Sequence, residues 1–133
     1  ELVRELNGEF IILSAGFDYY INHVLQSKGL QDTYLITNKG DFRHQTFIME
    51  PDETSPFYSD IYGVDKGSVA RFYKDKCKKL YFVGDSEPDV YAAVEADVIF
   101  AKSELAHILD TKGISYYPYN DFKDVLLKMK QGV

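Results

Sequence analysis

Several features that would assign a protein to a common class are missing from this chain. Cys77 is the only cysteine among 133 residues, so no internal disulfide can form, and a reducing, cytoplasmic setting is the simplest expectation. No apolar run approaches membrane-spanning length, and no signal peptide is visible. The formal net charge is −6, and the basic residues are scattered, which argues against a nucleic-acid partner.

Specific motifs are missing as well. There is no glycine-rich dinucleotide fingerprint and no P-loop. The three histidines, His23, His44 and His107, have no metal-ligand spacing, and each is expected to be structural or exposed. Cys77 falls on the predicted inner face of a helix, where a packed thiol is expected.

What the chain does contain is an alternation of short apolar runs and helical patterns. Strands are predicted over 10–13, 34–37, 46–49, 80–83, 98–101 and 115–117, with a turn at 38–41. Helices are predicted over 17–28, 68–77, 88–95, 103–110 and 121–130. Strands that are apolar on both faces, alternating with helices, indicate an α/β domain with a mostly parallel sheet covered by helices. We expect one domain over residues 1–133, with a small β-hairpin insertion at about 34–50.

Finer expectations follow from individual positions. The opening residues Leu2, Val3 and Leu6 have helical spacing, so the sequence is expected to begin inside a helix. Asn120 or Asp121 is expected to cap the last helix. The members of the first apolar helix face are expected to be Phe17, Tyr20, Ile21, Val24 and Leu25, with Gly29 closing that helix.

In open parallel sheets, ligands bind beyond the carboxyl ends of the strands. Ser14 follows the first apolar run and precedes Ala15, Gly16 and a helix, where a hydroxyl and free N–H groups would suit a phosphate oxygen. The alternative is that Ser14 caps the helix. Lys66 stands just before a helix start, where the dipole disfavours a cation. Neutralising a phosphate would explain it, and a solvated surface lysine is the alternative.

The third candidate site is the pair of aspartates in YFVGDSEPD. Asp89 has a structural explanation, because Ser86 and Asp89 match a capping box with Pro88 in the first turn. Asp85 has no such explanation. It ends a buried strand close to Asp89, and a bound Mg²⁺ would relieve the repulsion between the two carboxylates.

Taken together and in this order, the motifs resemble the haloacid dehalogenase (HAD) superfamily of phosphohydrolases. FIILSAG matches its Ser motif, GVDKGSVA its Lys motif, and YFVGDSEPD its GDxxxD motif, which is the most specific of the three. Within the superfamily the chain is similar to the phosphoserine-phosphatase-like group, and there to the methionine-salvage phosphatases. The resemblance covers nearly the whole chain and implies a three-layer, Rossmann-like fold.

The resemblance also implies a mechanism and a set of roles. In this superfamily an Asp at a strand end attacks phosphorus, and water hydrolyses the resulting aspartyl-phosphate. Ser14, with Ala15 and Gly16, would bind the phosphoryl group, and Lys66 would stabilise its oxygens. Asp85 would bind Mg²⁺ directly, and Asp89 would complete the acidic site through water or by holding Lys66. Hairpin residues 38–49 could line the substrate side, and the substrate would be a small phosphorylated metabolite.

One motif of the family is absent. No Asp-x-Asp follows an apolar strand anywhere, so the nucleophile and its central strand are not in this sequence. Leaving two strand edges unpaired in an apolar interior would cost roughly 1–3 kcal/mol per buried group. We therefore expect the chain to be the carboxyl-terminal portion of a phosphatase, completed by an amino-terminal segment or a second chain. The alternatives are a non-catalytic phosphate-binding module and a fragment without function of its own.

Overall fold

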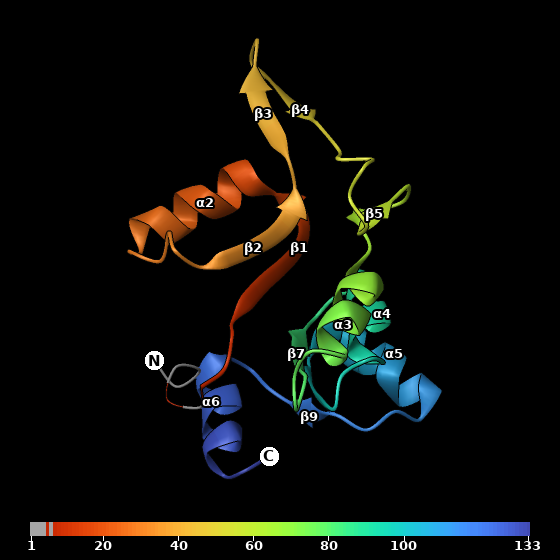
Figure 1. Ribbon diagram of the computed structural model, residues 1–133. Coiled ribbons are helices and arrows are strands. Elements are labelled where there is room, and N and C mark those ends of the chain that lie inside the picture. Colours follow the sequence, from red (N-terminus) through yellow and green to blue (C-terminus); the bar gives the residue numbers. More distant parts are fainter. Residues whose placement is uncertain (1–4, 6) are drawn as a thin grey trace. The chain divides into compact units, whose positions relative to one another are not determined.

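The computed structural model describes residue 5 and residues 7–133, which form two compact units, Glu1–Asp65 and Lys66–Val133 (Figure 1). We call them the amino-terminal and the carboxyl-terminal unit and describe each by itself. The helix expected at Leu2, Val3 and Leu6 lies outside the described residues. Both units combine helices with short sheets, which confirms the α/β class. The single domain and the complete Rossmann-like sheet stay predictions.

The amino-terminal unit begins with a parallel pair of strands joined by a helix. Strand β1 (Ile11–Phe17) pairs with β2 (Tyr34–Asn38), and α2 (Asp18–Ser27) connects them. The register shifts between Leu13 and Phe17, so β1 is irregular there. The first strand was predicted to end at residue 13, and it continues for four more residues, to Phe17.

Helix α2 buries less of its predicted apolar face than its spacing implies. Leu25 is buried, and Gly29 follows the helix with a φ of 68°, which is the left-handed geometry that glycine supplies after a helix. Tyr20 and Val24, however, are 55% and 57% exposed. The predicted apolar face is therefore correct at Leu25, but it included residues that are exposed.

The hairpin of this unit differs from its prediction. Its arms are β3 (Gly40–Arg43) and β4 (Thr46–Met49), and the turn is His44–Gln45, with φ values of 51° and 61°. Two successive positive φ values are typical of a type I′ turn. The predicted turn at 38–41 was wrong, and residues 34–37 pair with β1 instead of forming a hairpin arm. A second, smaller hairpin joins β5 (Tyr58–Ser59) to β6 (Gly63–Val64).

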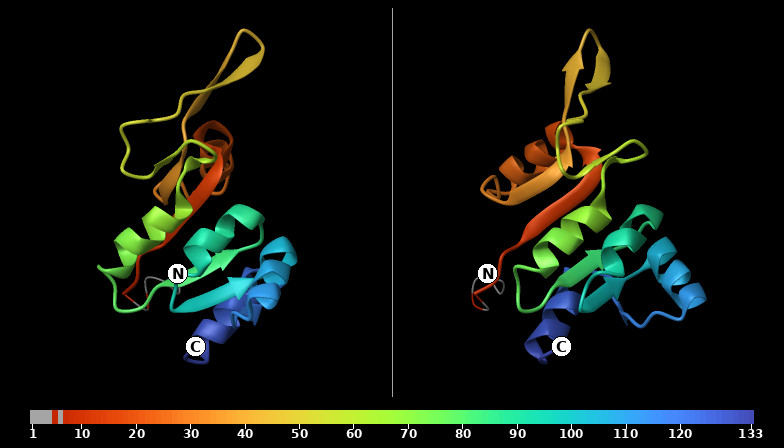
Figure 2. Two further views of the ribbon diagram at one scale, coloured as in Figure 1. Left: turned by 90° about the vertical axis from the view of Figure 1, so that its right-hand side faces the viewer. Right: turned by 45° about the vertical axis from the view of Figure 1, so that its right-hand side comes forward.

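The carboxyl-terminal unit is a small layered α/β structure (Figure 2). Its sheet has the order β7–β8–β9, all parallel. The strands are β7 (Tyr81–Gly84), β8 (Val98–Ala101) and β9 (Tyr117–Pro118), and the helices are α3 (Lys66–Lys74), the 3-10 turn η1 (Glu87–Asp89), α4 (Val90–Ala93), α5 (Ser103–Lys112) and α6 (Phe122–Lys130). Among the described residues, strand pairing stays within each unit.

Alternate residues of β8 face opposite sides of this sheet, as strand geometry requires. Ile99 and Ala101 pack in one cluster with Leu105 and Leu109 of α5. Phe100 packs in the other cluster with Val125 of α6. The all-apolar run 98–101 is thus buried on both faces, which explains why its bounds were predicted correctly.

Three local predictions for this unit need correction, and one is resolved. The helix expected over 88–95 is the 3-10 turn followed by one turn of α4. The strand expected over 115–117 lies at Tyr117–Pro118. Cys77 is exposed and lies beyond the end of α3, so the packed thiol was wrong. Asp121 caps α6, its side chain accepting hydrogen bonds from the N–H groups of Lys123 and Asp124.

Candidate active site

The core of the candidate site is an ion pair between Lys66 and Asp89. Lys66 is the first residue of α3, and Asp89 ends the 3-10 turn after β7. Lys66 Nζ lies 2.5 Å from Asp89 Oδ1, and the two side chains are 9% and 7% exposed. A buried ammonium at a helix start is disfavoured by desolvation and by the dipole, so this lysine depends on its carboxylate partner. The solvated surface lysine is excluded.

The second oxygen of Asp89 organises the turn that follows β7. Asp89 Oδ2 accepts hydrogen bonds from Asp85 N at 3.0 Å and from Ser86 N and Ser86 Oγ, each at 3.1 Å. The capping box predicted between Ser86 and Asp89 is present. Burial raises the pKa of Asp89, but the hydrogen bond from Lys66 and those from the Ser86 and Asp85 backbone outweigh it, so the pKa lies below its ordinary value.

Gly84 is required by this packing. A Cβ atom at position 84 would lie 2.7 Å from Asp89 Oδ2 and 2.7 Å from the Phe82 ring, both closer than van der Waals contact allows. The glycine before Asp85 therefore lets the carboxylate of Asp89 approach the strand end. This gives a physical reason for the Gly-Asp pair in the motif.

Asp85 has the opposite environment to Asp89. Its side chain is exposed, and its backbone carbonyl accepts a hydrogen bond from Leu105 N at 3.1 Å. Its carboxylate makes no hydrogen bond or ion pair with any residue that the structure describes. A fixed backbone with a free, hard oxygen donor suits Mg²⁺, which commonly takes one or two carboxylates together with substrate phosphate and water.

The two carboxylates differ as possible metal ligands. Both carboxylate oxygens of Asp89 accept hydrogen bonds, whereas the carboxylate of Asp85 is exposed. Within the described residues there is no group of three or more His, Cys, Asp or Glu side chains that could hold a metal ion. The donor set therefore fits Mg²⁺ through Asp85, while Asp89 is engaged in holding Lys66.

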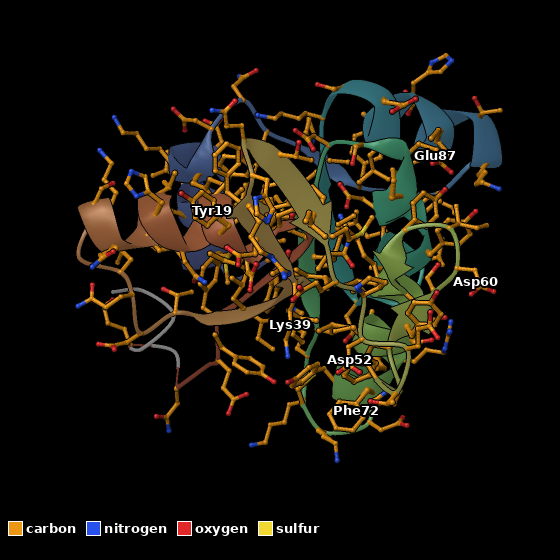
Figure 3. The ribbon with its side chains drawn as sticks, turned by 90° about the horizontal axis from the view of Figure 1, so that it is seen from above. Tyr19, Lys39, Asp52, Asp60, Phe72 and Glu87 are labelled. Carbon is orange, nitrogen blue, oxygen red and sulfur yellow. The ribbon has the colours of Figure 1, made fainter. Side chains whose placement is uncertain are left out.

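Residues of neighbouring elements also form hydrogen bonds with the turn that follows β7. Glu87, labelled in Figure 3, donates its N–H to Glu104 Oε2 at 3.1 Å. Tyr119, which is 7% exposed, donates its hydroxyl to the Gly84 carbonyl at 3.3 Å. Burial, and then the charges of Asp85 and Asp89, raise the pKa of Tyr119. The sequence analysis missed Tyr119, because no local pattern relates residue 119 to residue 84.

The predicted phosphate segment lies in the amino-terminal unit. Ser14 Oγ accepts a hydrogen bond from Gly16 N at 3.0 Å. The carbonyl groups of Ala15 and Gly16 accept hydrogen bonds from Asn38 Nδ2 at 2.8 Å and Thr37 Oγ1 at 2.7 Å. Ser14 does not cap α2, since the residue at the cap position is Phe17. The alternative explanation of Ser14 as a helix cap was therefore wrong.

Asn38 is the second residue that sequence reasoning missed. Its side chain is buried, and Nδ2 also donates to the Tyr62 carbonyl at 2.8 Å. Gly63 packs against it so closely that a Cβ there would lie 1.9 Å from Asn38 Oδ1. The one available signal was a polar residue ending the apolar run YLIT. Asn38 thus holds the irregular part of β1 that contains Ser14.

The structure brings three of the predicted residues together in the carboxyl-terminal unit, namely Lys66, Asp85 and Asp89. Ser14, Ala15 and Gly16 belong to the amino-terminal unit, and their share in the same phosphate site stays a prediction. No helix in the described part of the chain is long and apolar enough to cross a membrane.

Comparison with known proteins agrees with the motifs. No protein-family model matches the chain. A curated 2-hydroxy-3-keto-5-methylthiopentenyl-1-phosphate phosphatase from Exiguobacterium sibiricum is 31% identical over 122 residues, covering 90% of this chain and 55% of that protein. Phosphatases of the same name from Bacillus thuringiensis and Bacillus cereus are each 28% identical over 131 residues, covering 98% of the chain and 59% of each relative.

These relatives confirm the resemblance to HAD phosphatases of the methionine-salvage kind. The similarity extends over nearly all of the chain. The chain spans between half and two thirds of the length of these relatives. What the relatives do as whole proteins therefore enters below as a proposal.

Proposed function

We propose that this chain is part of a Mg²⁺-dependent HAD phosphatase that hydrolyses a small phosphorylated metabolite. The observation that carries the proposal is the buried Lys66–Asp89 pair beside the exposed carboxylate of Asp85. It supplies a fixed cation and an open hard-oxygen donor at one turn, which is what phosphoryl transfer requires of a protein.

Each residue has a distinct role in this proposal. Asp85 would hold Mg²⁺, which when bound supplies positive charge that stabilises the phosphoryl oxygens. Lys66 would present its ammonium to the phosphoryl group, and Asp89 would keep that ammonium in place. Ser14, with Ala15 and Gly16, would hydrogen-bond phosphate oxygens. The nucleophilic Asp would come from outside this sequence, from an amino-terminal segment or a second chain.

The substrate follows from the relatives. Their printed activity makes 2-hydroxy-3-keto-5-methylthiopentenyl-1-phosphate the first compound to test. We also propose a cytoplasmic setting, which is supported by the single cysteine and its exposed thiol.

The test is phosphate release by the full-length protein from this compound and from an aryl phosphate, with and without Mg²⁺. Asp85→Asn is expected to lower kcat/KM by about 100-fold or more, since it removes the open carboxylate. Asp75→Asn is the matched control, because Asp75 is an exposed aspartate of the same unit. Full activity in Asp85→Asn would refute the role of Asp85.

The absent Asp-x-Asp motif keeps a second candidate function in view. A non-catalytic module would bind a phosphorylated ligand without cleaving it. It predicts thermal stabilisation by inorganic phosphate without turnover of either compound. Mg²⁺-dependent turnover by the purified full-length protein would exclude this candidate.

A further inference from the structure

The backbone on both sides of Asp85 is held at every polar atom. Asp85 N and Ser86 N donate to Asp89 Oδ2 at 3.0 and 3.1 Å. The Asp85 carbonyl accepts from Leu105 N at 3.1 Å, and the Gly84 carbonyl accepts from Lys102 N at 3.3 Å. The two peptide planes that meet at the Asp85 Cα are thus fixed, and with them the direction in which this exposed side chain leaves the backbone.

Within the described part of the chain, two side chains are seen to hydrogen-bond these backbone atoms. One is Asp89, which belongs to the GDxxxD motif. The other is Tyr119, whose hydroxyl donates to the Gly84 carbonyl at 3.3 Å. Tyr119 lies 35 residues away along the chain, at the end of the third strand of the sheet. It is therefore a contact made by the fold rather than by the motif.

Tyr119 is itself well fixed. Its ring belongs to the buried cluster with Phe100 and Val125. Lys102 Nζ lies 4.9 Å from the centroid of that ring and donates to the Asn120 carbonyl at 3.2 Å. Lys102, which follows β8, therefore makes two connections. Its N–H binds the Gly84 carbonyl, and its side chain binds the carbonyl of Asn120, the residue after Tyr119.

We propose that Tyr119 is a positioning residue, whose hydroxyl holds the Gly84–Asp85 peptide in the orientation that presents the Asp85 carboxylate to a metal ion. The proposal rests on the proposed function of Asp85 as the Mg²⁺ ligand. Tyr119 touches neither substrate nor metal in it. The hydroxyl acts on the carbonyl side of the peptide, and Asp89 acts on the N–H side.

The carboxyl-terminal unit offers a matched control for the loss of a tyrosine hydroxyl. Tyr81, the first residue of β7, donates its hydroxyl to the Val133 carbonyl at 2.8 Å. Tyr81→Phe and Tyr119→Phe each remove one phenol-to-carbonyl hydrogen bond and keep the ring. Only Tyr119→Phe removes a hydrogen bond from the carbonyl next to Asp85, which keeps its bond from Lys102 N. It also leaves the aromatic face beneath Lys102 in place.

The experiment measures amide hydrogen exchange in the full-length protein, followed by a Mg²⁺ titration read from the amide signals of residues 84–86. In Tyr119→Phe we expect exchange at Asp85 and Lys102 to be about twofold to fivefold faster, and the Mg²⁺ midpoint to rise by a similar factor, as for loss of one weak hydrogen bond. In Tyr81→Phe we expect both quantities to match the wild type, although thermal stability falls.

The outcomes separate this proposal from the proposed function. Wild-type exchange at Asp85 and Lys102 in Tyr119→Phe, or an equal acceleration in Tyr81→Phe, would overturn the positioning role. A wild-type protein that shows no response to Mg²⁺ alone would refute the proposed function. The exchange measurement would still decide whether Tyr119 orients the peptide.

Discussion

The Lys66–Asp89 pair allows a prediction whose magnitude can be worked from the structure. The change is Asp89→Asn, which keeps the size of the side chain and removes its charge. Both partners are less than a tenth exposed, and Nζ and Oδ1 are 2.5 Å apart. The substitution leaves an ammonium buried at the first turn of α3, with the helix dipole against it and without its ion-pair partner.

The expected loss differs between the two partners. Breaking a buried pair at one end costs about 3–5 kcal/mol when the remaining charge is uncompensated, and we expect Asp89→Asn to fall in this range. Lys66→Met should cost less, about 1–3 kcal/mol, because the Asp89 carboxylate keeps its three donors from Asp85 and Ser86. The double variant should be more stable than the sum of the single losses predicts.

The assay is urea unfolding of the full-length protein at pH 7, with the three variants compared in one double-mutant cycle. Circular dichroism is a suitable probe, and the 11 tyrosines of this chain contribute a fluorescence signal. Asp75→Asn is the control for loss of one negative charge at an exposed site of the same unit. A loss below about 0.5 kcal/mol in Asp89→Asn, which is the range of ordinary surface changes, would refute the reasoning, and so would independent effects in the cycle.

Three further predictions concern other features of the fold. The lowered pKa of Asp89 stabilises the folded state at pH values above the ordinary aspartate pKa of 3.8, and this stabilisation is lost as the pH falls below that value. Asp89→Asn should therefore flatten the acid limb of a thermal-stability profile measured from pH 7 to 3. Ser103 has a φ of 53°, and Ser103→Gly should raise the unfolding free energy by about 0.5–1 kcal/mol in urea titrations, because glycine adopts this geometry without strain. Gly63→Ala places a Cβ 1.9 Å from Asn38 Oδ1 at a φ of 72° and should lower the unfolding free energy by about 2 kcal/mol or more. Gly113→Ala is the control, because Gly113 has a similar φ of 67° but nothing within 4 Å of the added Cβ, and its loss of stability should be smaller.

The sequence allowed correct predictions where one stretch of chain determines the outcome. The run 98–101 is a strand because both of its faces are buried. The capping box of Ser86 and Asp89 could be predicted because its partners are three residues apart. The return strand at 46–49 was also correct.

The predictions failed where the structure depends on contacts between residues far apart in the sequence, or on an unusual backbone conformation. Strand β1 continues past Leu13 because Thr37 and Asn38 bind the carbonyls of Gly16 and Ala15, and no local pattern contains those contacts. The hairpin turn was misplaced because His44 and Gln45 adopt positive φ values, although neither is the glycine or asparagine that usually marks such a turn.

The two aspartates of the GDxxxD motif carry the same charge and lie four positions apart, yet they differ in their hydrogen-bond partners and therefore in their roles. If a metal ion displaced Lys66 Nζ or the three donors of the turn from Asp89, a buried polar group would be released, at about 1–3 kcal/mol for a neutral donor and more for the ammonium. Asp85 can bind without any such exchange, because its backbone is already fixed and its carboxylate is exposed. The spacing of the motif follows from this division, since Asp89 reaches back over one turn to the N–H groups that orient Asp85.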